Sequence, residues 1–218
     1  MKILSILTVL VMFIYSFAFE MPLGNPFKEK VLYIGIDVSR DSVECKEAFR
    51  SYIAEVLKTV SWRSLRKGNI REVNIFLFDN QVRIVETISF KGSSMSRSSW
   101  KRFAEAVKES LRQMLRKFYQ KKKNFQLRDM TAAFDYVEQM VVRGKDRKSI
   151  VVLFTGAFQQ YDREVIKKLK YEMPEKTYVL SAFGKCLYET YSQRRLVFDR
   201  FVKEYWKNIK NVKWILLP

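Results

Sequence analysis

The 218-residue chain contains no histidine, and this absence excludes several kinds of chemistry. Imidazole is the usual general base of serine and cysteine hydrolases, so catalytic triads of that kind are excluded. Zinc sites that use histidine are excluded for the same reason. The chain is 48% apolar and 15% aromatic, a composition typical of one globular domain with a sizeable core.

Cysteine is also scarce, since Cys45 and Cys186 are the only two. An oxidising compartment would allow them to form a disulfide. Two separately buried thiols explain them equally well, because nothing in the sequence shows whether their Cα atoms lie within bonding distance. Both interpretations stay open at this point.

Acidic residues are few compared with basic ones. The sequence has 41 Lys and Arg and 23 Asp and Glu, which gives a formal net charge of +18 and a pI near 9.9. Such a charge favours anionic partners: an acidic protein, phospholipid head groups or nucleic acid.

Half of the net charge comes from residues 91–123, which contain only two acidic residues, Glu105 and Glu109. The segment can be a solvated helix face followed by a basic loop, or it can contact an anionic partner. Its basic residues are Lys91, Arg97, Lys101, Arg102, Lys108, Arg112, Arg116, Lys117, Lys121, Lys122 and Lys123.

Only the amino terminus contains a long apolar run. Lys2 precedes an uncharged stretch from residue 3 to residue 19, and Ser16 and Ala18 suit cleavage after Ala18. Residues 1–18 are therefore predicted to be a signal peptide or an uncleaved membrane anchor, and either would place the rest of the chain outside the cytoplasm. Residues 19–30 read as a linker, and 31–218 as one domain.

The apolar periodicity predicts alternating strands and helices. Strands are expected at 31–37, 71–90 (a hairpin turning at Asp79 and Asn80 with positive φ), 148–158, 176–184 and 212–218. Helices are expected at 42–60, 98–120, 128–144, 162–173 and 191–209. This order predicts an α/β fold: an open, doubly wound, mostly parallel six-stranded sheet with one antiparallel edge strand and helices on both faces.

Asp37, Ser39 and Asp41 follow the first buried strand directly. Ligands bind beyond the carboxyl ends of such strands, where the strand order reverses. With the order 3-2-1-4-5-6, that crevice lies between residues 31–37 and 150–155. Crowded, desolvated carboxylates need a cation, an arginine or amide donors to neutralise them.

Four segments in this order give the chain a resemblance to the von Willebrand factor type A (vWA) domain family, from about residue 31 to the end. They are "DVSRDS" after the first strand, "VNIFLFDNQVRI" in the hairpin, "RDMTAAFDYV" before a helix and "SIVVLFTGAF" as the fourth strand. The resemblance implies a binding module with a metal-ion-dependent adhesion site. There an Asp-x-Ser-x-Ser motif, a threonine and an aspartate hold a divalent cation, usually Mg²⁺.

The site implied by the resemblance is degenerate in this chain. Asp37 and Ser39 fit the motif, whereas Asp41 replaces its second serine. The remaining two positions depart from the pattern: Arg128 stands where the threonine is expected, beside Asp129, and Gly156 follows Thr155 where the aspartate is expected. Thr131 could substitute only in a shifted register.

Three interpretations of this cluster stay open. Arg128 can replace the cation, because a guanidinium pairs with carboxylates and repels Mg²⁺. An altered site can still bind Mg²⁺ or Ca²⁺. Finally, Asp41 or Ser42 can simply cap the following helix.

The sequence thus favours a noncatalytic, exported or membrane-tethered module that binds another protein, in a cell-envelope or surface assembly. Its basic helix would suit an acidic partner or an anionic membrane surface. The alternative is an Mg²⁺-dependent nuclease or transposase, because "IGIDVSRDS" also resembles the first strand of RNase H-like domains. Export and the immediate start of a helix after Asp37 argue against that enzyme and against nucleic acid as the partner.

Overall fold

The computed structural model describes residues 30–91, 96–120, 130–143, 148–156 and 170–218. The predicted signal peptide or anchor, the linker up to residue 29, Lys121, Lys122, Lys123, Arg128 and Asp129 therefore lie outside the described residues. In the described part, no helix is both long and apolar enough to cross a bilayer.

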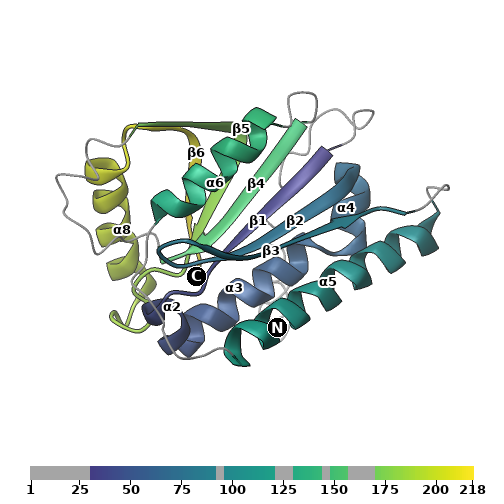
Figure 1. Ribbon diagram of the computed structural model, residues 1–218. Helices are drawn as coiled ribbons and strands as arrows, with labels where there is room; N and C mark the ends of the chain where they lie inside the picture. Colours follow the sequence, from purple (N-terminus) through teal and green to yellow (C-terminus); the bar gives the residue numbers. More distant parts are fainter. Residues whose placement is uncertain (1–29, 92–95, 121–129, 144–147, 157–169) are drawn as a thin grey trace, which may run out of the picture.

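Six strands form one sheet in the order β3-β2-β1-β4-β5-β6 (Figure 1). The strands are β1 (Lys30–Asp37), β2 (Ile70–Phe78), β3 (Val82–Ser89), β4 (Lys148–Thr155), β5 (Tyr171–Ser181) and β6 (Ile209–Leu216). All neighbours are parallel except β2 and β3, which form the antiparallel hairpin at one edge. The predicted fold class and strand order are confirmed.

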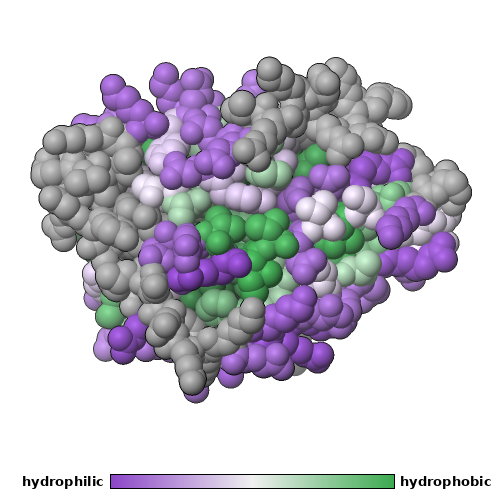
Figure 2. Space-filling model, in the orientation of Figure 1, coloured by the Kyte–Doolittle hydropathy of each residue, from purple (hydrophilic) through white to green (hydrophobic). Residues whose placement is uncertain are grey.

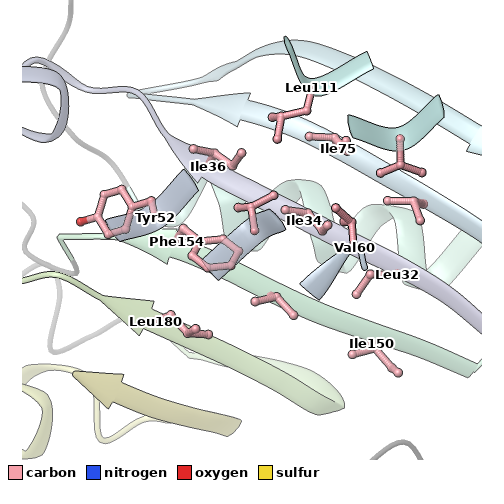
Figure 3. Close-up of a cluster of buried hydrophobic side chains, with 14 of the residues drawn as sticks. Leu32, Ile34, Ile36, Tyr52, Val60, Ile75, Leu111, Ile150, Phe154 and Leu180 are labelled. Atoms are coloured by element: carbon pink, nitrogen blue, oxygen red, sulfur yellow. The ribbon is translucent and has the colours of Figure 1, made fainter. Parts of the chain in front are cut away.

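Helices cover both faces of this sheet (Figure 1). The helices in the described residues are α2 (Arg40–Glu44), α3 (Lys46–Thr59), α4 (Trp62–Gly68), α5 (Arg97–Gln120), α6 (Met130–Arg143) and α8 (Tyr191–Tyr205). On one face, α3, α4 and α5 pack against the alternate β1 residues Leu32, Ile34 and Ile36 (Figure 3). On the other, α6 packs against Val31 and Tyr33. Because β1 is buried on both faces, its sequence is a continuous apolar run.

Gly35 marks a close contact at the centre of the sheet. A Cβ added there would lie 2.5 Å from Cζ of Phe76 and 2.7 Å from Cδ2 of Leu153. The side chains of β2 and β4 therefore meet over β1 where glycine leaves the space open.

Three local predictions are wrong. The predicted helix at 42–60 is broken at Cys45, whose ψ of 84° is not helical. The predicted helix at 162–173 fails at its end, because Tyr171 begins β5 and pairs with Ile209 of β6; its earlier residues 162–169 lie outside the described part. Among the described non-glycine residues, only Asn69 and Asn211 have positive φ, so the hairpin turn at Asp79 and Asn80 is not of the expected type.

That hairpin is closed by a side chain instead. Three residues, 79–81, join the strands, and Oδ1 of Asp79 accepts a hydrogen bond of 3.1 Å from the Gln81 amide. A register shift between Leu77 and Phe78 accompanies this turn. An Asx turn and a bulge replace the positive backbone angles that a two-residue turn would need.

Candidate functional site

Three parallel strands end side by side at the edge where the sequence predicts the site. Asp37 is the last residue of β1, Phe78 of β2 and Thr155 of β4. Asp37 is in register with Phe78, and Ile36 is in register with Phe154. The residues that follow these strands are therefore neighbours, although 118 positions separate Asp37 from Thr155.

The carboxylate of Asp37 is fully buried and accepts hydrogen bonds on both oxygens. Oδ1 accepts one from the Ser39 amide at 2.9 Å. Oδ2 accepts one from the Thr155 hydroxyl at 2.9 Å and one from the Gly156 amide at 3.4 Å. These donors replace part of the water that the carboxylate lost on burial, which is the condition for keeping such a group inside a protein.

Ser39 joins this carboxylate to the following helix. Its carbonyl oxygen accepts a hydrogen bond of 3.1 Å from the Val43 amide, so Ser39 stands at the start of α2. Asp41 and Ser42 lie within α2, and α3 begins after Cys45 without a side-chain cap. The interpretation of Asp41 or Ser42 as the helix cap is therefore wrong, because the helix begins before them.

The Ser39 hydroxyl is the one buried polar atom of this cluster that has no hydrogen-bond partner among the described residues. Ser39 is only 1% exposed. A buried hydroxyl without a partner loses free energy relative to water, so its oxygen is suited to a polar group brought by a ligand or by another part of the chain.

A second carboxylate stands at the same edge of the sheet. Asp79 follows β2, is 1% exposed, and accepts hydrogen bonds of 2.9 and 3.0 Å on its two oxygens from Nε of Arg83. The sequence pattern predicts Asp79 only as a turn residue. The signal was nevertheless present, since Asp79 follows a buried apolar strand just as Asp37 does.

The disulfide question is settled: Cys45 and Cys186 are bonded, with Cα atoms 5.9 Å apart. The bond joins the break between α2 and α3 to the turn that follows β5. It therefore fixes two segments that begin at the carboxyl end of the sheet. Stable disulfides are typical of oxidising compartments, and the export of the chain stays a prediction.

A polar contact lies next to the disulfide. Nζ of Lys185 donates a hydrogen bond of 2.6 Å to the Ser51 hydroxyl of α3. Burial, together with the nearby positive charge of Arg194, lowers the pKa of Lys185 below its ordinary value. The contact adds a second tie between α3 and the turn after β5.

The other predicted site residues are only partly brought together. Thr131 lies in the first turn of α6 and is partly buried; Gly156 is buried beside Asp37. The side chain of Asp41 is outside the described set, as are Arg128 and Asp129 in full. The hypothesis that Arg128 replaces a cation therefore stays a prediction.

A divalent cation would need several hard oxygen ligands, and the described residues do not supply them. Mg²⁺ takes six, and Ca²⁺ six to eight. Around Asp37 the described side chains offer its own carboxylate, whose oxygens already accept three hydrogen bonds, and the hydroxyls of Ser39 and Thr155. Across the described ranges, no three acidic or cysteine side chains are grouped as metal ligands. The described donors stabilise the Asp37 carboxylate by hydrogen bonds, and a metal-free site stays a prediction.

The described residues of the predicted basic surface, Lys108, Arg112, Arg116 and Lys117, lie on α5, and three of them form ion pairs. Lys108 contacts Glu105 at 2.8 Å, Arg112 contacts Glu109 at 3.2 Å, and Lys117 reaches Glu86 of β3 at 3.6 Å. The hydrogen bond from Lys108 also holds the pKa of Glu105 below its ordinary value. Arg116 is exposed on the same helix. These pairs reduce the field that the helix presents to a membrane or another polyanion.

A scan against models of known protein families and a search of curated proteins both find no match for this chain.

Proposed function

We propose that the chain is a noncatalytic, vWA-like module that binds another protein through the loops around Asp37. The observation that carries the proposal is the Asp37 carboxylate, buried at the ligand-binding edge of the sheet and hydrogen-bonded by Ser39, Thr155 and Gly156. A carboxylate held in this way keeps the loops after β1 and β4 in a fixed arrangement without chemistry of its own. The quoted sequence segments and the fold class support the family assignment.

The site works without a metal ion in this proposal. Protein donors take the place that a cation holds in the family, and Arg128 is the proposed source of positive charge. Binding then depends on the shape and polar groups of the loops, including the buried Ser39 hydroxyl. A partner's carboxylate is not required to complete a metal shell.

The module acts outside the cytoplasm, as an exported or membrane-tethered protein of a cell-envelope or surface assembly. The predicted leader at 1–18 and the Cys45–Cys186 disulfide support this location. The nuclease alternative receives less support, because a catalytic Mg²⁺ site needs further carboxylates near Asp37, and Asp79 is paired with Arg83.

Photo-crosslinking from the loop tests the proposal. A benzoylphenylalanine replaces Arg40, an exposed residue next to Ser39, in the full chain expressed in its own cells. Arg195 serves as the matched control position, because it is similarly exposed on α8 and pairs with Asp199 as Arg40 pairs with Glu44. We expect a discrete protein adduct from position 40 that persists in excess EDTA and is absent from position 195. No adduct from position 40, or the same adducts from both positions, would refute the proposal.

A further inference from the structure

The outer edge of β3 is unpaired in the described part of the chain. The strand pairs with β2 on one side and is the last strand of the sheet. An antiparallel edge strand directs the N–H and C=O groups of every second residue away from its partner. Val85 is 42% exposed on this strand, and Figure 2 shows apolar surface gathered over β3 with hydrophilic surface along α5.

A groove of about 540 Å³ runs between this strand and α5. Its strand side is formed by Thr87, Ile88, Ser89, Phe90 and Lys91, and its helix side by Ser99, Arg102, Phe103 and Ala106. The four helix residues have the spacing of a single helix face. Phe90 and Phe103 meet edge to face, with ring centroids 5.5 Å apart, and give the groove an aromatic wall.

Two cations at this groove are not neutralised within the described chain. Lys91 and Arg102 are exposed and make no ion pair with a described residue, unlike Lys108, Arg112 and Lys117 farther along the same surface. A ligand in the groove would therefore meet uncompensated positive charge. Apolar and aromatic walls with cations beside them match an extended segment that alternates apolar and acidic side chains.

We propose that this groove binds an extended, acidic segment of a partner protein, which adds to the edge of β3 as a further strand. Main-chain hydrogen bonds to β3 would supply affinity, and Arg102 and Lys91 would select acidic side chains. A second copy of this chain is disfavoured as the occupant, because it would bring two molecules of net charge +18 together.

This surface is separate from the Asp37 site. Because β3 runs antiparallel to β2, Ser89 is in register with Glu72, near the start of β2, whereas Asp37 is in register with Phe78 at its end. The groove and the Asp37 loops therefore lie at opposite ends of the sheet. The strand-addition proposal stands or falls independently of the function proposed for the Asp37 loops.

Binding of a defined probe tests the proposal. The probe is a fluorescent nine-residue peptide of alternating valine and glutamate, titrated into the full chain and followed by anisotropy. A control peptide carries N-methyl groups on every second backbone amide, those that would face β3. This change prevents pairing with the strand and keeps every charge.

Four protein variants complete the test. Arg102→Glu reverses a groove charge, and Arg116→Glu makes the same change on α5 outside the groove. Ala106→Trp fills the groove, and Ala54→Trp is its match at an exposed position of α3.

The proposal predicts saturable binding that weakens at least about tenfold with Arg102→Glu, with Ala106→Trp and with backbone methylation. Arg116→Glu and Ala54→Trp should change it less than about threefold, since neither residue lines the groove. Absence of saturable binding, full binding of the methylated peptide, or equal losses with Arg102→Glu and Arg116→Glu would each overturn strand addition. Displacement of the peptide by phosphatidylserine vesicles, with vesicle binding lost in Ala106→Trp, would overturn it in favour of a lipid ligand.

Discussion

Thr155, at the end of β4, donates its hydroxyl hydrogen to Oδ2 of Asp37, at the end of β1, over 2.9 Å. This bond joins the two central strands of the sheet at the edge where open α/β sheets bind their ligands. It also satisfies an oxygen that burial would otherwise leave desolvated. The stability of the chain and the arrangement of its loops therefore depend on the same contact.

Replacement of Thr155 by valine should lower the free energy of unfolding by about 1–3 kcal/mol. Valine keeps the shape of threonine and removes the hydroxyl, so a buried carboxylate oxygen loses a donor. Chemical denaturation followed by circular dichroism would measure the change. Thr59→Val is the matched control, because the Thr59 hydroxyl bonds a helix carbonyl in α3. That control should stay within about 0.5 kcal/mol of the wild type, and equal losses in both variants would contradict the role of the Asp37 contact.

Loss of the disulfide should destabilise the chain by about 2–5 kcal/mol. The bond closes a sequence separation of 141 residues, so its removal releases a large loop in the unfolded chain. Cys45→Ser combined with Cys186→Ser, compared with the wild type by thermal unfolding, would show the effect. Added reductant should lower the melting temperature of the wild type and leave that of the double variant unchanged. A wild type insensitive to reductant would count against a structural disulfide.

Gly35→Ala should cost about 1–3 kcal/mol of stability through overpacking. The new methyl group would lie 2.5 Å from Phe76, within a layer where the side chains of β2 and β4 already meet. Denaturant unfolding measures this loss. The double variant Gly35→Ala with Phe76→Leu should recover part of it, because the smaller side chain opens space; a further additive loss would argue against the steric cause.

The Lys185 side chain should make the free energy of unfolding depend on pH in the alkaline range. Burial lowers the pKa of Lys185 below the value of 10.5 that it has in the unfolded chain. Between the two pKa values the unfolded state binds more protons than the folded state, so the contribution of this group to stability rises with pH. We therefore expect the free energy of unfolding to rise more steeply with pH in the wild type than in Lys185→Gln. Denaturant unfolding of both proteins at several pH values below 10.5 would measure the two slopes. Parallel curves would show that the group does not titrate differently on folding.

The strand order could be predicted from sequence because it follows from general rules. Continuous apolar runs at residues 31–37 and 150–155 predict strands buried on both faces, and the rules for connecting parallel strands leave few topologies. The same argument places Asp37 at the carboxyl end of a central strand, where the structure has it.

The details of the site depend on contacts that sequence spacing does not contain. The break at Cys45 and its bond to Cys186 depend on two segments meeting across 141 positions. Periodicity near residue 171 favours a helix, but pairing with Ile209 of β6 makes that segment a strand. Propensity gives way to tertiary pairing in such cases. The sequence does not mark Asp79 as a buried carboxylate, because an aspartate between two strands is already expected in a hairpin turn.

In the function proposed above, protein donors rather than a divalent cation stabilise the Asp37 carboxylate. Calorimetric titration of MgCl₂, then MnCl₂ and CaCl₂, into the chelator-treated protein tests it most directly, with Asp37→Asn beside the wild type. A metal-free site predicts no saturable binding in either protein, because the Asp37 oxygens already accept hydrogen bonds from Ser39, Thr155 and Gly156. Saturable binding of one ion per chain in the wild type, lost in Asp37→Asn, would contradict it.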